Sequence, residues 1–159
     1  MIRDHPALES FFLSDCTSEE ISGNEILHSI ITAGRNKLKD IYLKDNDIST
    51  EGSTFLSDFL ASNPVLQQLN LSKNQLNDTD ATLIANALKR NTNLHYLDLE
   101  RNPITRDGCE ALRKTEFDNT SLNSVADSNH TCRILYPNSD TGFNDGAADS
   151  YEPRDTKSL

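Results

Sequence analysis

The sequence is poor in several residue types, and each shortage excludes a class of protein. It has no tryptophan, one methionine and three cysteines among 159 residues. The cysteines (Cys16, Cys109 and Cys132) lie far apart and form no C-x-x-C pair, which argues against a disulfide framework and a structural zinc site. No phosphate-binding glycine motif or metal-ligand spacing is present either, so we expect reduced thiols and neither a metal nor a cofactor.

Positive charge is also scarce. Lys and Arg together number 15, against 25 Asp and Glu, and the formal net charge is -10. The basic residues are scattered along the sequence, so the chain should repel phosphate backbones and anionic lipid. We therefore expect neither nucleic acid nor membranes as partners.

Long apolar runs are absent as well. No stretch approaches the roughly 20 apolar residues of a membrane-spanning helix. The N-terminal segment carries Arg3, Asp4 and Glu9 where a signal peptide would need an apolar run. These features predict an intracellular protein, and we place it in the cytoplasm.

What the sequence does contain is a repeated phrase. LKDIYLKDNDI (38–48), LQQLNLSKNQL (66–76) and LHYLDLERNPI (94–104) each start 28 residues after the previous copy. All three obey L-x-x-[LI]-x-L-x-x-N-x-[LI]. A fixed period of about 20 to 29 residues with this phrase is the signature of leucine-rich repeats.

The phrase predicts a short strand and then a turn. Leu69 and Leu71 lie two residues apart, so they face one side of a strand, while Asn70 between them faces the other. An amide side chain can satisfy the backbone groups that the following turn buries, and an asparagine occupies this place in every copy. We expect these residues to stack as an asparagine ladder: Asn46, Asn74 and Asn102.

A helical pattern follows each strand, over residues 49–63, 77–91 and 105–117. Apolar residues four apart, such as Ile84 and Leu88, predict one buried helix face. Ser49, Asn77 and Thr105 begin these segments and are suited to the N-cap position. Strand, turn and helix therefore repeat as one unit.

Weaker copies flank the regular ones. One starts at Leu8, with Cys16 in the asparagine place, and one starts at Leu122, where Asp127 replaces a core leucine. A charge in a core column is costly, so the last unit should end the stack. We expect a solenoid over residues 1–135, with repeats starting near 8, 38, 66, 94 and 122, and an acidic, disordered tail over 136–159.

The repeat length, the phrase and the helix after each strand resemble the ribonuclease-inhibitor-like subclass of leucine-rich repeat proteins. That subclass includes Ran GTPase-activating proteins, tropomodulin-like caps and the sensor arms of NOD-like receptors. The resemblance covers residues 8–132 and implies an α/β, right-handed solenoid of about five repeats, with parallel strands on the concave face and helices on the convex face. It is specific for fold but not for function, because one solenoid type serves many tasks.

The variable positions of the phrase should form an array on the concave face. Phe12, Tyr42 and Tyr96 fall there, and aromatic side chains are favoured as interface anchors. Polar side chains around them would supply further contacts: Asp40, Lys44, Gln68, Asn70, Lys73, Asp98, Glu100 and Arg101. The alternative is that the aromatic residues simply suit strands and pack against their cross-strand neighbours.

These features predict a non-enzymatic module that binds another protein through its concave face. His95 and Asp98 share one strand, but nothing marks a nucleophile beside them. Three alternatives follow from the resemblance: a regulator of a small GTPase similar to Ran GTPase-activating proteins, an actin-capping protein of the tropomodulin type, and one arm of a larger NOD-like sensor.

The start of the chain raises a separate question. Its first residues, including HPAL, are in phase with a repeat, and no capping sequence comes before them. The core residues of the first repeat, such as Phe11, would then lie close to water. Three explanations stay open: the chain is a fragment of a longer array, it self-associates through this repeat, or the repeat frays.

Overall fold

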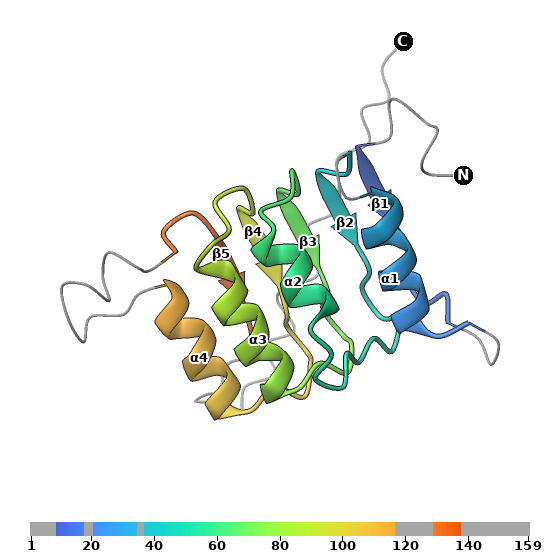
Figure 1. The fold of residues 1–159 in the computed structure, drawn as a ribbon. Helices are drawn as coiled ribbons and strands as arrows, with labels where there is room; N and C mark the ends of the chain where they lie inside the picture. Colours follow the sequence, from blue (N-terminus) through green and yellow to red (C-terminus); the bar gives the residue numbers. More distant parts are fainter. Residues whose placement is uncertain (1–8, 18–20, 35–36, 117–128, 138–159) are drawn as a thin grey trace, which may run out of the picture.

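Short strands and helices alternate along the chain (Figure 1). The computed structural model describes residues 9–17, 21–34, 37–116 and 129–137, and all structural statements below concern these residues. The strands are β1 (Ser10–Phe12), β2 (Asp40–Tyr42), β3 (Gln68–Asn70), β4 (Tyr96–Asp98) and β5 (Arg133–Leu135). The helices are α1 (Gly23–Gly34), α2 (Phe55–Ala61), α3 (Asp78–Leu88) and α4 (Arg106–Glu116).

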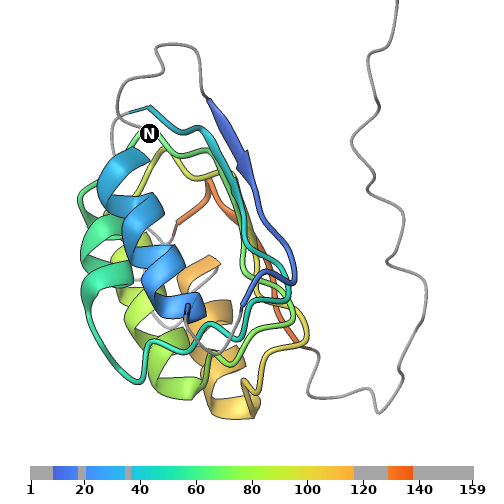
Figure 2. The same ribbon diagram turned by 90° about the vertical axis from the view of Figure 1, so that its right-hand side faces the viewer.

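The strands form one parallel sheet in chain order, β1-β2-β3-β4-β5. The four helices all pack on the same side of this sheet, as the turned view shows (Figure 2). Each of the first four strands therefore leads to a helix that returns the chain to the next strand. The predicted α/β repeat architecture is confirmed.

The 28-residue period sets the register of the central strands. Ile41 pairs with Leu69, and Leu69 pairs with Leu97, so equivalent positions of the phrase stand side by side. All three side chains are buried between the sheet and the helices. The helices add Leu27, Leu60, Ile84, Leu88 and Leu112 to this core. The leucines of the phrase are therefore used for packing and are not available for binding.

Helix starts follow the predicted caps only in part. Asn77 forms a capping box at α3: its side chain accepts from the backbone of Asp80, and the Asp80 side chain accepts from the backbone N–H of Asn77. The Ser49 prediction was wrong, because α2 begins later, with Thr54 at its N-cap. Between Ser49 and Thr54 the chain makes a turn in which Gly52 has a φ of 77°.

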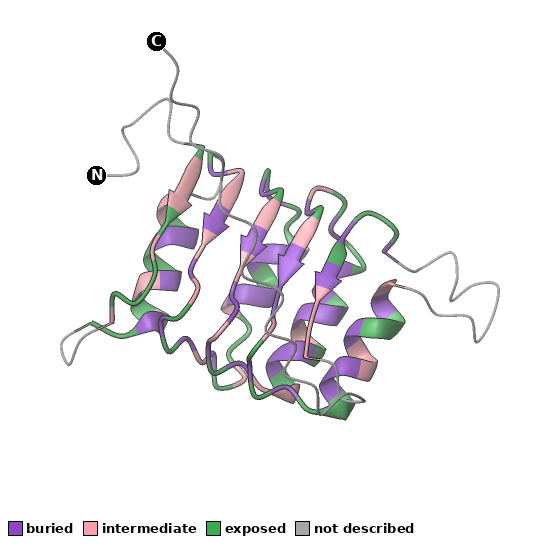
Figure 3. Ribbon diagram, turned by 180° about the vertical axis from the view of Figure 1, so that it is seen from behind, coloured by how far each residue is buried: buried purple, intermediate pink, exposed green. Residues whose placement is uncertain are grey.

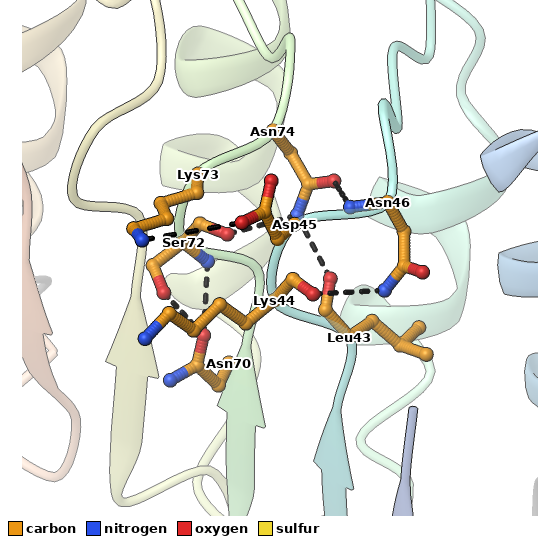
Figure 4. Close-up of polar contacts among 8 residues, drawn as sticks. All are labelled: Leu43, Lys44, Asp45, Asn46, Asn70, Ser72, Lys73 and Asn74. Atoms are coloured by element: carbon orange, nitrogen blue, oxygen red, sulfur yellow. Dashed lines mark hydrogen bonds and ion pairs between the residues drawn. The ribbon is translucent and has the colours of Figure 1, made fainter. Parts of the chain in front are cut away.

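The asparagine ladder joins neighbouring repeats by hydrogen bonds. The Nδ2 of Asn74 donates to the carbonyl oxygen of Leu43 in the previous repeat, at 2.9 Å, and its Oδ1 accepts from the N–H of Asn46, at 3.0 Å. Figure 4 shows this link between Asn74 and Asn46. Asn102 makes a similar link one unit later: it donates to Leu71 and accepts from the N–H of Leu76, as Asn74 accepts from the N–H of Ile48. Asn46, Asn74 and Asn102 are all buried, so these bonds are shielded from water.

A left-handed residue comes directly before each ladder position. Asp15, Asp45, Lys73 and Arg101 have φ values of 53°, 62°, 54° and 57°. None is a glycine, and a side chain in this conformation costs about 1 kcal/mol. We attribute this left-handed conformation to the turn, because it directs the side chain of the following ladder position back against the sheet.

The fifth strand lies later in the chain than the repeat period predicts. β5 pairs with β4 through Tyr96 and Arg133 and through Leu97 and Ile134. We had placed this strand in the segment that starts at Leu122, most of which lies outside the described residues. Ile134 stands in the column of Leu97. Two residues later Tyr136 packs against the core in the column of Leu99, where the Leu122 segment would have brought Asp127.

A second set of asparagines, Asn91 and Asn129, ties the starts of β4 and β5 to the helix one repeat earlier. Asn91 donates to the carbonyl oxygen of Leu60 at the end of α2, and its Oδ1 accepts from the N–H of Leu94. Asn129 repeats this arrangement: it donates to Leu88 at the end of α3 and accepts from the N–H of Cys132. The phrase NTNL (91–94) therefore has its counterpart in NHTC (129–132), which our sequence analysis overlooked.

The described part of the chain ends just after β5. Tyr136 packs against the core, and the Sγ of Cys109 donates to the carbonyl oxygen of Pro137. The tail was predicted over 136–159, and all of it after Pro137 lies outside the described residues. All three cysteines are free, and burial raises the pKa of Cys132 to about 12. None of the described helices has the length and apolar character needed to cross a membrane.

Candidate partner-binding site on the strand face

The side of the sheet that faces away from the helices is here called the strand face. Figure 3 looks onto it, with the strands in front of the helices. Side chains alternate along each strand, so two rows point to this side. The pairing register fixes their order across the sheet. One row is Ser10, Asp40, Gln68, Tyr96 and Arg133, and the other is Phe12, Tyr42, Asn70, Asp98 and Leu135.

A shallow groove of about 1180 Å³ runs along the strand face and takes side chains from all five strands or the turns that follow them. Ten of the eleven predicted contact residues line it: Phe12, Tyr42, Lys44, Gln68, Asn70, Lys73, Tyr96, Asp98, Glu100 and Arg101. Asp40 is not among the lining residues. Its carboxylate accepts a hydrogen bond of 2.7 Å from Ser10, which ties β2 to β1.

An aromatic pair forms the β1 end of the groove. The rings of Phe12 and Tyr42 are stacked, with centroids 4.4 Å apart and planes 7° apart. Phe12 stays 57% exposed, and the hydroxyl of Tyr42 donates to Oε1 of Gln68 at 2.8 Å. The stack and this hydrogen bond hold the Tyr42 ring in place while leaving apolar area of Phe12 in contact with water.

The middle of the groove is a connected polar network. Asn70 donates to the carboxylate of Asp98 at 3.0 Å and accepts from both the N–H and the hydroxyl of Ser72. Asp98 also accepts from the N–H of Glu100, at 3.0 Å. Burial raises the pKa of Asp98, and these hydrogen bonds and Lys44 oppose that shift. Asp98 is only 8% exposed, so it positions Asn70 more than it faces solvent.

Basic side chains surround this network. Lys44, Lys73 and Arg101 follow β2, β3 and β4, and Arg133 begins β5. In Figure 4 the Lys44 and Lys73 side chains extend from their own strands in the direction of β4. Lys73 has an acidic neighbour in Asp45, with Nζ and Oδ2 3.9 Å apart. Both side chains of that pair are substantially exposed, so the pair contributes little stability.

Comparison with known proteins identifies the repeat. A family model described as Leucine Rich repeat matches residues 62–85 and 90–112, which include β3, β4 and parts of α3 and α4. The fold is a leucine-rich repeat solenoid. Its strands and helices have the order that this repeat type predicts.

A solved structure titled "Leiomodin-1 Actin-Binding Site 2 (ABS2)" is similar to this solenoid. The match has a TM-score of 0.54 and 22% sequence identity, and covers 72% of this chain and 61% of that chain. At this identity the likeness shows the fold alone. The chain also spans less than two thirds of the matched structure. No curated protein sequence matches this chain.

Arg133 and Leu135 also line the groove, and our sequence analysis missed both. They come from the fifth leucine-rich repeat, whose strand we had placed too early. The spacing from Asn129 to Cys132 was the available signal, since it matches the spacing from Asn91 to Leu94. Gln67, Ser72 and His95 lie in the groove as well, beside the predicted residues of their strands.

Metal ligands are not gathered on the described repeats. Within residues 9–17, 21–34, 37–116 and 129–137, no group of three or more His, Cys, Asp and Glu side chains could hold a metal ion. His95 lies in the groove near the Asp98 network, but the side chains around it are those of a polar binding surface. The arrangement can therefore offer hydrogen bonds, charges and aromatic contact to a partner.

Proposed function

We propose that this chain is a non-enzymatic protein-binding module that takes its partner in the groove of the strand face. One observation carries the proposal: an exposed aromatic ring, Phe12, stands at one end of a groove lined from all five repeats. No described helix covers this side of the sheet. The partner would therefore contact the side chains directly, without displacing part of the fold.

Two features of the groove favour binding over simple packing. A ring that only packs against its cross-strand neighbour should be largely buried, yet Phe12 remains 57% exposed beside Tyr42. The hydrogen bonds from Tyr42 to Gln68 and from Asn70 to Asp98 also fix the surrounding side chains before a partner arrives. Such preorganisation lowers the entropy lost on binding.

We assign the solenoid to the ribonuclease-inhibitor-like subclass because of its 28-residue period and the helix that follows each of the first four strands. We also propose a cytoplasmic location, since the three cysteines are few and far apart and all are free thiols. Expression of a tagged full-length chain followed by cell fractionation tests the location. Recovery in a secreted fraction would contradict it.

A second candidate function is actin binding. The matched solved structure is named for an actin-binding site, and an actin-capping protein was one of the alternatives from the sequence. The test is co-sedimentation of the full chain with filamentous actin, with the Phe12→Ser and Tyr42→Ser double variant as the comparison. Recovery of only the unchanged chain with the filaments supports this candidate. Equal recovery of both proteins, or of neither, counts against it. The GTPase-regulator and sensor-arm alternatives stay predictions.

The main proposal is tested by affinity capture from the source cells, followed by quantitative mass spectrometry. Phe12→Ser combined with Tyr42→Ser should lower recovery of the specific partner at least about tenfold, as expected for the loss of interface anchors. The matched control is Val65→Ser, because Val65 is apolar and 44% exposed but does not line the groove. Thermal melting should show that all variants remain folded. Equal capture by the aromatic variant and the control would rule out the groove as the binding site.

A further inference from the structure

The groove carries the opposite charge to the chain as a whole. Its lining includes four basic side chains, Lys44, Lys73, Arg101 and Arg133, and two acidic ones, Asp98 and Glu100. The formal charge of the lining is therefore +2, counting His95 as neutral, while the net charge of the chain is -10. A positive surface on a strongly acidic protein is a local feature that the overall composition does not predict.

The acidic side chains of the lining only partly cancel this charge. Asp98 is buried, and its two carboxylate oxygens accept hydrogen bonds from Asn70 and from the N–H of Glu100. A carboxylate engaged in this way projects less negative charge toward a partner. Glu100 is partly exposed and is the remaining acidic group among the lining residues.

The basic groups follow a path across the sheet. Lys44, Lys73 and Arg101 come after three successive strands, and strands in a sheet lie about 4.8 Å apart. Lys73 and Arg101 occupy equivalent left-handed positions, so the same backbone turn presents both. The four steps from β1 to β5 span about 19 Å, which an extended chain of about six residues can cover.

We propose that the groove binds an acidic, extended peptide segment of a partner protein. An aromatic or apolar side chain of that segment contacts Phe12 beside Tyr42, and its carboxylates lie against Lys73, Arg101 and Arg133. Hydrogen bonds between guanidinium or ammonium groups and carboxylates would hold it. This inference rests on the proposed function and adds the chemistry of the partner.

A peptide fits these observations better than a nucleic acid. A nucleic acid carries a charge at every phosphate, so it would meet Glu100 in the groove and the long-range repulsion of a chain with net charge -10. The Phe12 and Tyr42 rings are also stacked on each other, which covers faces that a base would need for stacking. An acidic peptide carries charge only at some of its residues. Its carboxylates can therefore lie opposite the basic side chains, with uncharged residues opposite Glu100.

The probe is a displayed library of random twelve-residue peptides, selected on the full chain in 50 mM NaCl. We expect the selected peptides to carry net negative charge and an aromatic residue. Their affinity should fall at least about tenfold in the Lys73→Glu and Arg101→Glu double variant, as expected for like charges at an interface. Replacing their acidic residues with Lys should restore binding to that variant. Raising the NaCl concentration to 500 mM should weaken binding to the unchanged chain.

The matched control is the Lys89→Glu and Arg90→Glu double variant. It changes the net charge by the same amount, at exposed residues just after α3 that do not line the groove. Its affinity for the selected peptides should change less than about threefold, because exposed charges at a distance are screened. An equal loss of affinity in both double variants would overturn the inference, since only total charge would then matter.

The remaining outcomes separate this inference from the proposed function. If the selected peptides are neutral or basic and no longer bind the Phe12→Ser and Tyr42→Ser variant, the groove remains the binding site. The inference that its partner is acidic is then overturned. Peptides that bind this aromatic variant and the Lys73→Glu and Arg101→Glu variant unchanged would overturn both proposals. Tighter binding of a twelve-nucleotide single-stranded DNA than of any selected peptide would also overturn the acidic-peptide inference.

The chain supplies one competing occupant of its own. Asp140, Asp145 and Asp149 lie in the acidic C-terminal segment. If replacing these three residues with Asn tightens peptide binding more than about tenfold, this segment occupies the groove in place of a separate partner, and the inference is overturned. Unchanged affinity supports it.

Discussion

The middle of the solenoid is held together by more amide hydrogen bonds than its first repeat. Asn74 makes five hydrogen bonds, three with the preceding repeat and two within its own. At the equivalent place in the first repeat stands Cys16, whose Sγ donates to Ser14 in the same repeat. The link from Asn46 to the first repeat is correspondingly smaller, with one bond to Leu13 and one from the N–H of Cys16.

This difference indicates how stability is distributed along the molecule. Each repeat contacts only its neighbours, so the stability of a solenoid is close to a sum over repeats and the interfaces between them. A weaker interface at β1 lets the first repeat open while the centre stays folded. Phe12 lies on that repeat, so the same end carries both a weak interface and the main aromatic candidate for binding.

The largest expected effect comes from removing a central core side chain. Leu69→Ala should lower the free energy of unfolding by about 3 to 4 kcal/mol, because Leu69 is fully buried and the sheet can relax little around the cavity. Phe11→Ala, in the edge strand β1, should cost about 2 kcal/mol because Phe11 is only partly buried. Urea denaturation of both variants measures the difference. An equal cost at both sites would show that the first repeat is as tightly packed as the centre.

The ladder gives the next largest effect. Asn74→Ala should cost about 3 kcal/mol, since it leaves the buried N–H groups of Asn46 and Ile48 without their acceptor. Asn46→Ala should cost about 2 kcal/mol, because its links run to the less buried first repeat. The control is Asn86→Ala on the exposed side of α3, which should change stability by less than about 0.5 kcal/mol. A ladder substitution that costs no more than the control would show that the amides do not stabilise the stack.

The C-terminal end is expected to respond locally. Asn129→Ala removes hydrogen bonds to the carbonyl oxygens of Leu88 and Asn91 and should cost about 1 to 2 kcal/mol. The effect should be concentrated at β5, because an end repeat can open alone. Hydrogen exchange is the suitable measurement: the amides of β5 should exchange faster while those of β3 keep their protection. Uniform acceleration along the sheet would mean that the solenoid unfolds as one cooperative unit.

The smallest effect concerns the pH dependence of the central network. Burial raises the pKa of Asp98 above its ordinary value of 3.8. Its contribution to folding is therefore fully present below about pH 3.8 and is lost as the pH rises through the folded value. The free energy of unfolding of Asp98→Asn, relative to the unchanged chain, should accordingly rise from pH 3.5 to pH 7. Urea titrations at the two pH values measure this. If the difference in free energy of unfolding between Asp98→Asn and the unchanged chain stays constant or falls over this pH range, burial does not raise the pKa of Asp98.

The regular part of the fold could be predicted because its chemistry repeats. Leu69 and its equivalents have to face the core at a fixed period, and Asn74 has to satisfy a buried turn, so both leave a strong pattern in the sequence. The fifth strand escaped prediction because the chain after α4 departs from the period. There the only local signal is the short phrase NHTC (129–132), and the strand position depends on a tertiary hydrogen bond from Asn129 to the carbonyl oxygen of Leu88.

Which side chains lie on the strand face could be predicted for a similar reason. The alternation along each strand determines which side chains stand opposite the core, so Tyr42 and Gln68 could be assigned to one face. Their hydrogen bond, the stacking of Phe12 on Tyr42 and the burial of Asp98 depend on side-chain conformations that spacing does not determine. Arg133 was missed together with its strand.

The ladder also has a consequence for engineering. Each central rung connects one repeat to the repeat before it, as in the bond between Asn74 and Asn46, and it uses positions that recur in every regular copy of the phrase. A duplicated copy of residues 66–93 inserted after residue 93 would therefore meet matching partners on both sides. Such an insertion should lengthen the solenoid by one strand, about 4.8 Å, and add one more Gln, Asn and Lys to the groove. The length of the groove can therefore be set by the number of duplicated repeats.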